Sequence, residues 1–527
     1  MLRDFRFPRT LVWLATLAGC ALLPALAAAT PDDYIRPGSR LDDELRILDV
    51  LGPAARDSAM RLPHMGIRPL QVSEVVAAAG SPLPSDPAAR ITRIRLARAL
   101  ERDAGVDGWS PAHDRSTPRL LQLASAERER FEFSAGLEGN ALWAADSLAR
   151  FGSGSGLHVR GAAAFDRWLI YVHLVSGYFD SARTYADPIV TGHDLTTSTD
   201  ETYLAYTGQA SRWGVQFGRS RWHFGPGDEG SLMLSKTSAA LTGLAMHARI
   251  EPLRADVFAL SATLQAAAGE QLAAHRLEWQ PEDGLRIGIS EAARYHASTW
   301  QPLYLVGVVP YVLVQRLQVQ DEADSSDALR NNIMFGMDAA WRIAPGTRVY
   351  GELLLDDVHA RTSENPNKYA YQLGWEGAGS AHGNRLTWGT EYTRVTRYVY
   401  TSFFDRSFVA QGTPLGYPFG PDTRRLRVRG SIDPSPDWQL RALAAWTDQG
   451  ENTVNEPYVP GSPPVDASTF EGVVTRTREV ELGLGWMPAS GVELAAAVGY
   501  RWIDNAAHVS GDARHGATAA ASLRLTR

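Results

Sequence analysis

The chain has 527 residues, of which 44% are hydrophobic, and its mean hydropathy is -0.21. This composition excludes a bundle of membrane-spanning helices, because each crossing helix needs about 20 consecutive apolar residues. The formal net charge is -7, with 52 Lys plus Arg against 59 Asp plus Glu, so no basic excess indicates a nucleic-acid partner.

The first 29 residues predict an export signal. Arg3, Arg6 and Arg9 form a basic front, an apolar run follows from Leu11 to Leu26, and residues 27–29 are alanines suited to cleavage. We therefore expect an exported protein whose mature chain begins near residue 30.

The single cysteine, Cys20, falls within this signal, so we expect the mature protein to contain no disulfide. Residues 17–20 read Leu-Ala-Gly-Cys, which is a lipoprotein cleavage box. The sequence leaves two outcomes open, a lipid on Cys20 and ordinary cleavage near Ala29.

Residues 30–120 predict a small helical segment. Apolar side chains recur there at i, i+4 and i+7, at Leu41, Leu45 and Leu48. Ser39 is a candidate N-cap for this helix, and Gly52 is expected to end it.

Two more helices are expected in this segment, over residues 71–79 and 87–102. The second has a basic side that includes Arg98. Such a side is usually solvated, and the alternative is contact with anionic lipid or polymer.

From residue 121 onward the hydrophobic period changes to two, which is typical of strands with one apolar face. Many of these stretches have roughly nine to eleven residues, the length that crosses a bilayer obliquely. Trp and Tyr tend to bracket them, as in the aromatic girdles of membrane barrels. A soluble all-β protein is the alternative, but it would bury those aromatic residues. The alternation is clearest in 131–137, 213–217, 386–392, 438–446, 480–486 and 492–502.

We therefore predict a mainly β fold, in which residues 121–527 form a transmembrane antiparallel β-barrel. The sheet should close, because an open edge in hydrocarbon leaves backbone groups unsatisfied. At about 20 to 24 residues per strand and connection, this length gives about 16–20 strands, and 18 is favoured among the even counts. A monomer is expected. The polar stretches that we expect to be extracellular loops are Asp180–Thr202, Asp321–Asn332, Phe403–Thr423 and Gly450–Thr475.

Two blocks of sequence carry a family resemblance. Residues 213–240 read WGVQFGRSRWHFGPGDEGSLMLSKTSAA, with an expected strand at 231–235 after the Gly-Pro-Gly turn. Residues 391–430 read EYTRVTRYVYTSFFDRSFVAQGTPLGYPFGPDTRRLRVRG, with a Gly-x-Pro-Leu-Gly turn at 412–416. Both blocks resemble the Wzi capsule-assembly family. The resemblance implies an outer-membrane barrel with helices on its periplasmic side that holds capsular polysaccharide at the cell surface, as a lectin-like factor and not as a catalyst.

The sequence contains few signs of other chemistry. Residues 225–230 satisfy Gly-x-Gly-x-x-Gly, but a dinucleotide site needs a helix after the glycines and a strand is expected here. We expect no catalytic residues, no metal site and no cofactor. A chance catalytic trio is defined by geometry, so a barrel hydrolase stays an alternative.

The candidates for polymer contact are aromatic and charged residues in the two family-like blocks: Arg219, Trp222, His223, Tyr417 and Asp422. Rings stack on the apolar face of sugars, while Arg and Asp bind hydroxyl and carboxyl groups. The alternative for each is a structural role in a turn or at the membrane interface.

The function that we predict is non-enzymatic attachment of exported capsular or extracellular polysaccharide through surface loops, with the lumen obstructed. The other partners expected are outer-membrane lipid and lipopolysaccharide. A diffusion porin is the second hypothesis.

Overall fold

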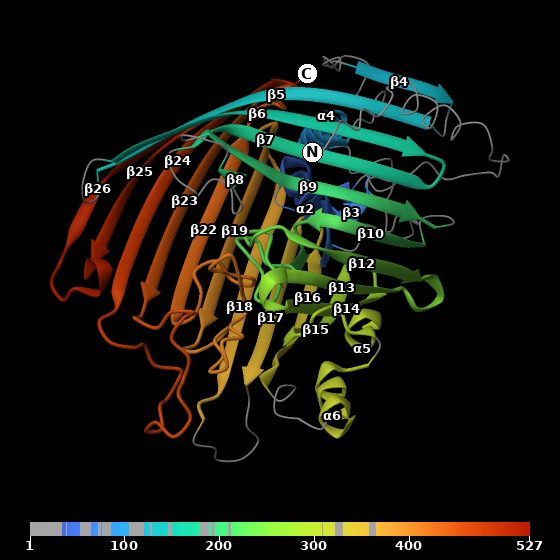
Figure 1. Ribbon diagram of the computed structural model, residues 1–527. Helices are drawn as coiled ribbons and strands as arrows, with labels where there is room; N and C mark the ends of the chain where they lie inside the picture. Colours follow the sequence, from blue (N-terminus) through green and yellow to red (C-terminus); the bar gives the residue numbers. More distant parts are fainter. Residues whose placement is uncertain are drawn as a thin grey trace, which may run out of the picture.

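A computed structural model describes residues 34–37, 39–52, 65–71, 75, 86–104, 121–126, 129–145, 150–179, 189–190, 195–208, 212–307, 309–321, 330–357 and 365–526. Within these residues an antiparallel sheet of 18 strands closes into a barrel, which confirms the predicted fold class and strand number (Figure 1). Each strand pairs with the next along the chain, and the last strand closes the barrel on the first. Its strands are β5 (Glu129–Ala144), β6 (Arg150–Phe165), β7 (Trp168–Phe179), β9 (Leu195–Thr207), β10 (Trp213–Ser220), β12 (Leu241–Ile250), β13 (Ala255–Gln265), β14 (Glu270–Glu282), β15 (Leu285–His296), β16 (Asn332–Ala344), β17 (Thr347–Asp357), β18 (Lys368–Ala381), β19 (Asn384–Val395), β22 (Thr423–Asp433), β23 (Trp438–Gln449), β24 (Thr475–Ala489), β25 (Val492–Asp504) and β26 (Arg514–Thr526).

Shorter strands lie outside this closed sheet. Two of them extend it at its margins, β4 (Leu121–Ala126) beside β5 and β8 (Ile189–Val190) beside β9. The others form two-stranded pairs: β1 (Tyr34–Ile35) with β3 (Leu70–Gln71), β2 (Ile67–Arg68) with β11 (His223–Phe224), and β20 (Val409–Ala410) with β21 (Thr413–Pro414). The pairing of β2 with β11 joins the N-terminal segment to the β10–β12 connection.

The two ends of the barrel differ in the length of their connections. One end, which we call the short-turn end, has tight hairpins such as 166–167, 283–284 and 382–383. The other, the long-loop end, carries the longer segments, and the orange loops are drawn at the bottom of Figure 1. The connections most important below are 221–240, 297–331, 396–422 and 450–474.

The expected loops fall at the long-loop end, with one correction. The expectation for Asp180–Thr202 is wrong at its C-terminal part, because β9 begins at Leu195 and pairs with β7 from there. Residues 196–199 read Thr-Thr-Ser-Thr, a composition typical of a loop, but they lie within the strand. The expectation for Asp321–Asn332 falls mostly on residues 322–329, which lie outside the described residues.

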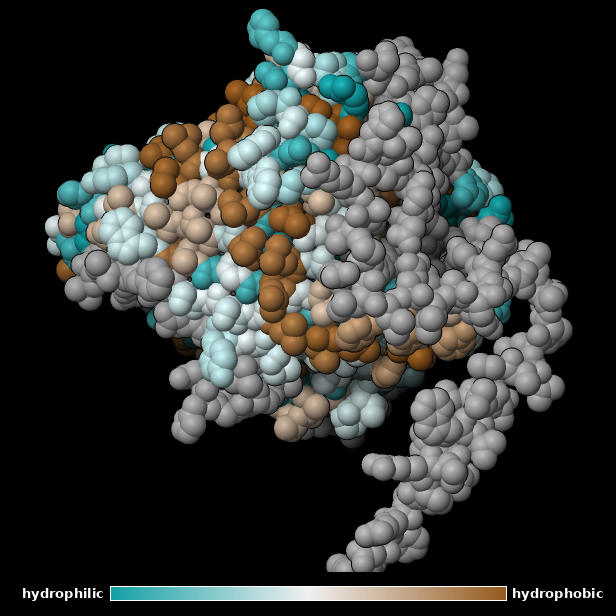
Figure 2. Space-filling view, turned by 90° about the horizontal axis from the view of Figure 1, so that it is seen from above, coloured by the Kyte–Doolittle hydropathy of each residue, from teal (hydrophilic) through white to brown (hydrophobic). Residues whose placement is uncertain are grey.

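The barrel wall shows the predicted alternation of apolar and polar faces. On β24, exposed Val480, Leu482 and Leu484 alternate with Glu481 and Gly483, which point into the barrel. Exposed tryptophans gather near the short-turn end, as an aromatic girdle requires, at Trp168, Trp213, Trp279, Trp341 and Trp438. Figure 2, a view from above, shows brown apolar residues gathered on the outer surface beside hydrophilic ones.

Two helices occupy the inside of the barrel near its short-turn end, α2 (Arg40–Leu51) and α4 (Pro87–Ala104) (Figure 1). Both confirm the predicted helices. The Ser39 hydroxyl accepts a hydrogen bond from the Asp42 amide at 3.3 Å, and Gly52 closes α2 on the carbonyl of Leu48 at 3.0 Å. The helix expected over residues 71–79 falls largely on residues outside the described ranges.

No helix in the described part of the chain is long and apolar enough to cross a membrane. The basic side of α4 needs a correction, because Arg98 is neither solvated nor turned toward lipid. Its guanidinium donates to Asp437 at 2.8 Å and to the carbonyl of Met487 at 2.7 Å. Neighbouring Arg95 is buried and lies 3.1 Å from Asp433. Arg95 and Arg98 therefore dock the helix inside the barrel, where the wall supplies acidic and carbonyl partners, whereas Arg90 and Arg93 are exposed, as expected of a solvated side.

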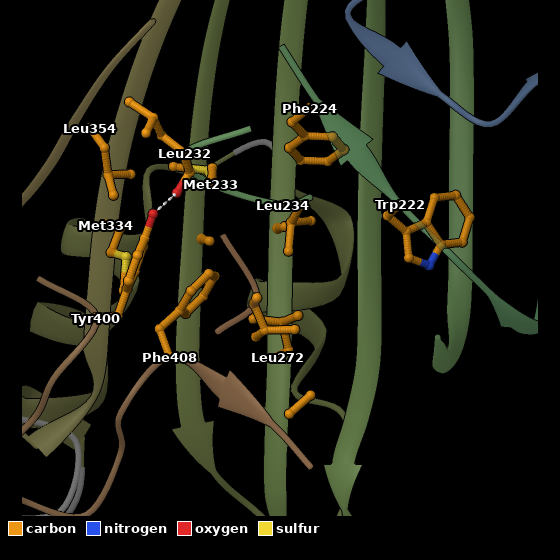
Figure 3. Packing of buried hydrophobic residues seen from close by; sticks show 14 of the residues in the cluster. Trp222, Phe224, Leu232, Met233, Leu234, Leu272, Met334, Leu354, Tyr400 and Phe408 are labelled. Atoms are coloured by element: carbon orange, nitrogen blue, oxygen red, sulfur yellow. Dashed lines mark hydrogen bonds between the residues drawn. The ribbon is translucent and has the colours of Figure 1, made fainter. Parts of the chain in front are cut away.

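The main apolar core lies inside the barrel, between the wall and two inward-folded connections, 221–240 and 396–422. Figure 3 shows wall residues Leu272, Met334 and Leu354 gathered around Leu232 and Leu234 of the first connection and Tyr400 and Phe408 of the second. The strand expected at 231–235 is wrong: these residues form bends. The segment lies in the lumen, and its two alternating leucines, Leu232 and Leu234, are both buried in the core.

Candidate functional site

Connection 221–240, which contains the Gly-Pro-Gly turn, is fixed to the wall by two carboxylates. Glu352 of β17 accepts hydrogen bonds from the amides of Gly227 at 2.7 Å and Leu232 at 2.9 Å. Glu391 of β19 accepts one from the amide of Asp228 at 2.7 Å. Because both carboxylates lie inside the barrel, the turn is held in the lumen and is not a hairpin tip.

The acidic residues of this turn pair with arginines. Asp228 lies 2.6 Å from Arg429, 2.8 Å from Arg427 and 3.5 Å from Arg46 of α2. Burial alone would raise the pKa of Asp228, but Arg429 and Arg46 outweigh burial and hold it well below its usual value. The carboxylate therefore stays ionised and joins the helical segment to the wall.

Connection 396–422 packs against connection 221–240. The Tyr400 hydroxyl donates to the carbonyl of Leu232 at 2.6 Å (Figure 3), and the Ser235 amide donates to the carbonyl of Leu415 at 2.8 Å. The Tyr417 hydroxyl donates to Glu229 at 2.9 Å. Together, the two connections occupy the lumen along β12–β19 beneath the long-loop end.

The structure places the five candidate residues mainly in this framework. Arg219 is half-buried on β10 and donates to the carbonyl of Thr199 at 3.2 Å. Trp222 packs against Phe258, with ring centroids 5.3 Å apart, and is 4% exposed. Their role in polymer contact stays a prediction.

The other three candidates are fully buried. His223 lies on β11, where its Nδ1 accepts a hydrogen bond from the Lys236 amide at 3.2 Å. Asp422 accepts one from the amide of Glu471 at 2.9 Å, which ties connection 396–422 to connection 450–474. Tyr417 binds Glu229, so the structure brings the two family-like blocks together through this pair. All three contact protein groups, and their part in polymer binding also stays a prediction.

An open groove of about 530 Å³ lies at the long-loop end, which we call the rim groove. It runs between the ends of β16, β17 and β18, helix α6 (Tyr311–Asp321) and connections 396–422 and 450–474. Its polar and aromatic lining includes Arg330, Asp357, Lys368, Phe403, Phe404 and Tyr458.

The rim groove has a charged floor. The Lys368 ammonium lies 2.6 Å from Asp357 and 3.6 Å from Asp356, and it donates to the carbonyl of Thr401 at 3.2 Å. The side chain of Asp357 remains 54% exposed, so one carboxylate faces solvent. Asp356 also accepts from the Tyr400 amide at 2.7 Å. The groove floor is therefore attached to the packed lumen below it.

Aromatic rings border this floor. Phe403 and Phe404 are each 47% exposed and meet edge to face, with centroids 5.4 Å apart. The Arg330 guanidinium lies over the Phe404 ring at 5.6 Å. Exposed ring faces beside a carboxylate, amides and a cation can pack on the C–H face of a sugar and bind its hydroxyls. This arrangement suits carbohydrate better than a purely apolar or purely charged ligand.

Reasoning from the sequence missed the rim groove. Two signals were available: Lys368 is one of only two lysines in the chain, and it follows a pair of aspartates at the end of the preceding strand. The adjacent pair Phe403 and Phe404 in an otherwise polar stretch was the second. Within the described residues, no group of three His, Cys, Asp or Glu side chains is placed to hold a metal ion.

Comparisons with known proteins agree with this architecture. The family described as "Capsule assembly protein Wzi" matches residues 124–518, well over half of the chain. No curated protein matches the chain. Among solved structures, Wzi of Escherichia coli is similar with a TM-score of 0.63 and 16% identity, over 93% of this chain and 99% of that one. Its description is an outer-membrane protein involved in group 1 capsule assembly that is a carbohydrate-binding β-barrel.

Two other barrels are more distant. OprD of Pseudomonas aeruginosa has a TM-score of 0.43 and 10% identity, over 75% of this chain and 95% of that one. OccAB1 of Acinetobacter baumannii has a TM-score of 0.44 and 10% identity, over 75% and 96% of the two chains.

Proposed function

We propose that this chain, which belongs to the Wzi capsule-assembly family, is an outer-membrane protein that binds exported polysaccharide and attaches it at the cell surface. The observation that carries the proposal is the rim groove, with exposed rings, an exposed carboxylate and a lysine on a rigid support. Long connections of bacterial barrels face outward and short turns face the periplasm. The groove therefore faces the medium, and α2 and α4 lie toward the periplasm.

The groove acts by binding and not by catalysis. Its lysine is paired with two aspartates, so we assign it to holding the floor and orienting Asp357. The rings of Phe403 and Phe404 present apolar faces, and Asp357 accepts from sugar hydroxyls. A polymer offers many equivalent repeat units, so weak contacts at one groove per barrel add up across many barrels.

A double variant, Phe403→Ala with Phe404→Ala, tests this role. Two rings at roughly 0.5–1.5 kcal/mol each correspond to an affinity loss of about 5-fold to 160-fold. The measurement is binding of purified capsular polysaccharide to the barrel in detergent. Val509→Ala, an exposed side chain in the β25–β26 connection, is the matched control and should bind as the wild type does. Equal binding by the double variant and the control would remove the groove from the proposal.

A test in cells addresses the role itself. Deleting the gene should release polymer into the medium without stopping its synthesis, because attachment follows export. Unchanged retention of polymer would contradict the proposal.

A diffusion porin is the second candidate, and one observation favours it. Charged residues on the inner face of β23–β26 are partly open to solvent, which indicates water in that part of the lumen. Planar-bilayer recordings separate the two functions: we expect no large open conductance, since two connections and two helices fill the rest of the lumen.

A further inference from the structure

The described part of the β15–β16 connection folds back along the outside of the barrel, and only its edge, at Val312 and Arg330, borders the rim groove. It forms α5 (Pro302–Val306) and α6 (Tyr311–Asp321), which lie at the lower right of Figure 1, beside β13–β15. One side of this pair is buried against outward-facing wall residues. The cluster consists of Tyr304, Tyr311 and Val314 from the helices and Ala273, Ala293 and Tyr295 from the wall.

The helices cover a polar His–Glu pair on the outer wall. His275 of β14 and Glu291 of β15 are direct strand partners, and their side chains lie 3.2 Å apart. The Tyr311 amide donates to Glu291 at 2.8 Å, and the Tyr311 ring lies 4.3 Å from the imidazole of His275. Uncovered, these polar side chains would face hydrocarbon, where polar groups are costly to keep.

The strand register places this pair within the apolar wall and not above it. Glu291 is the partner of Phe335, which is in turn the partner of Leu355, and both are outward-facing apolar residues. On the other side, His275 is the partner of Ala259. Because α5 and α6 cover this row, they lie at the level where neighbouring strands present apolar side chains to the membrane.

The exposed side of the two helices is itself apolar. Its members are 43–49% exposed and continue the apolar surface of the wall: Leu303, Val312, Leu313 and Leu317. Arg316 is exposed on the same side of α6. Leucines beside a cation on one helix face are typical of helices that lie at a membrane interface.

The rim groove shows the same gradient from apolar to charged. Beside its charged floor of Lys368 and Asp357, the groove has an apolar base formed by Val312 of α6 and by Ile333, Phe335 and Leu355 of the wall, and Arg330 lies in its upper part, nearer the loops. A ligand made only of sugar would leave the apolar base without contacts. A ligand made only of acyl chains would leave the charged upper part without contacts. A molecule with acyl chains below an anionic sugar headgroup fits both.

We propose that the exposed side of α5 and α6, together with the base of the rim groove, docks a phosphorylated glycolipid of the surrounding outer leaflet. Acyl chains pack on Leu313, Leu317 and the groove base, and headgroup phosphates bind Arg316 and Arg330. The inference rests on the proposed function for the membrane and its orientation. It does not depend on capsule binding.

Spin labels test the position of α6. The only cysteine of the chain is Cys20, inside the expected export signal, so Leu313→Cys and Leu317→Cys can be labelled singly in the mature protein. In vesicles of phosphatidylcholine with rough lipopolysaccharide, both labels should collide more with oxygen than with a water-soluble nickel chelate. Val509→Cys, 56% exposed in the β25–β26 connection, is the matched control and should favour nickel. Labels at 313 and 317 that behave like the control would overturn the proposal.

Retention of glycolipid tests the headgroup contacts. Native mass spectrometry of barrel extracted from the same vesicles should show lipopolysaccharide retained by the wild type. Arg316→Gln with Arg330→Gln should reduce it roughly tenfold, equivalent to about 1.4 kcal/mol. Arg254→Gln, in a turn at the opposite end of the barrel, should retain the wild-type amount.

Equal retention by the double variant and the Arg254 variant would overturn the assignment of the two arginines. No capsular polysaccharide is present in either assay. A wild-type barrel that binds no capsular polysaccharide, but shows the expected label positions and lipid retention, would therefore contradict the proposed function and leave this inference standing.

Discussion

The inner face of the barrel has two halves that use the same residue type in opposite ways. Along β14–β19, four inward arginines are 5% exposed or less and each meets acidic partners: Arg276, Arg286, Arg348 and Arg385. We call this the packed half. Along β23–β26, which we call the open half, the inward arginines are 37–47% exposed: Arg441, Arg501 and Arg524.

The difference follows from what lies against each half. In the packed half, α2 supplies carboxylates to the wall: Asp49 pairs with Arg286 at 2.6 Å, and Glu44 pairs with Arg385. In the open half, Arg441 meets only a long contact to Glu481 at 3.8 Å. The packed half therefore carries the rigid support of the rim groove, whose Asp356 and Lys368 stand at the ends of its strands. Buried ion pairs build that support, while exposed pairs contribute little.

The largest expected effect comes from removing one arginine in each half. Arg385→Met removes the partner shared by buried Glu44 and Asp433 and leaves them Arg95, at 3.7 and 3.1 Å, so the free energy of unfolding should fall by about 3 kcal/mol, the lower end expected for a broken buried pair. Arg441→Met removes an exposed pair and should cost about 0–1 kcal/mol. Denaturant unfolding of both variants in the same detergent measures the contrast. Equal losses would show that the two halves are not energetically different.

A smaller effect is expected at the contact between the two inward-folded connections. Tyr400→Phe deletes the hydroxyl that donates to the carbonyl of Leu232 and accepts from the Tyr417 amide at 3.0 Å. Both backbone groups are buried, so we expect a loss of about 2 kcal/mol in unfolding free energy. Tyr500→Phe, whose hydroxyl contacts His515 at an exposed site on the outer face, should change it by less than about 0.5 kcal/mol. Denaturant unfolding measures both variants. A Tyr400 variant as stable as the Tyr500 variant would contradict the claim that the two connections pack tightly in the lumen.

Much of the fold could be predicted because its strands and helices follow from the spacing of apolar residues that are close together in the sequence. The two-residue alternation gives the wall, and the leucine spacing with Ser39 gives α2. The period says which side of a strand is apolar, but it does not say what covers the polar side. Arg385 and Arg441 follow the same alternation, and only the position of α2 makes one buried and the other exposed.

The site could not be predicted for a related reason: its contacts join residues far apart in the chain. Glu352 accepts a hydrogen bond from the amide of Gly227, which lies 125 positions away in the chain. The alternating residues 231–235 predicted a strand, and only the carboxylate of Glu352 and the carbonyl of Leu415 show why they form bends in the lumen. The rim groove likewise collects side chains from strands and connections that no local pattern unites.

The smallest expected effect concerns pH and His223, which lies in the packed half. Burial first, and then nearby Arg68, Lys236, Arg46 and Arg276, lower the pKa of His223 well below its ordinary value of 6.5. The unfolded chain therefore takes up a proton near pH 6.5 that the folded chain does not, so stability falls as the pH drops below that value. His223→Gln keeps an acceptor for the Lys236 amide and removes the titration. The wild type should lose more unfolding free energy than the variant between about pH 8 and about pH 5, and identical losses would mean that the imidazole becomes charged without disturbing the packed half.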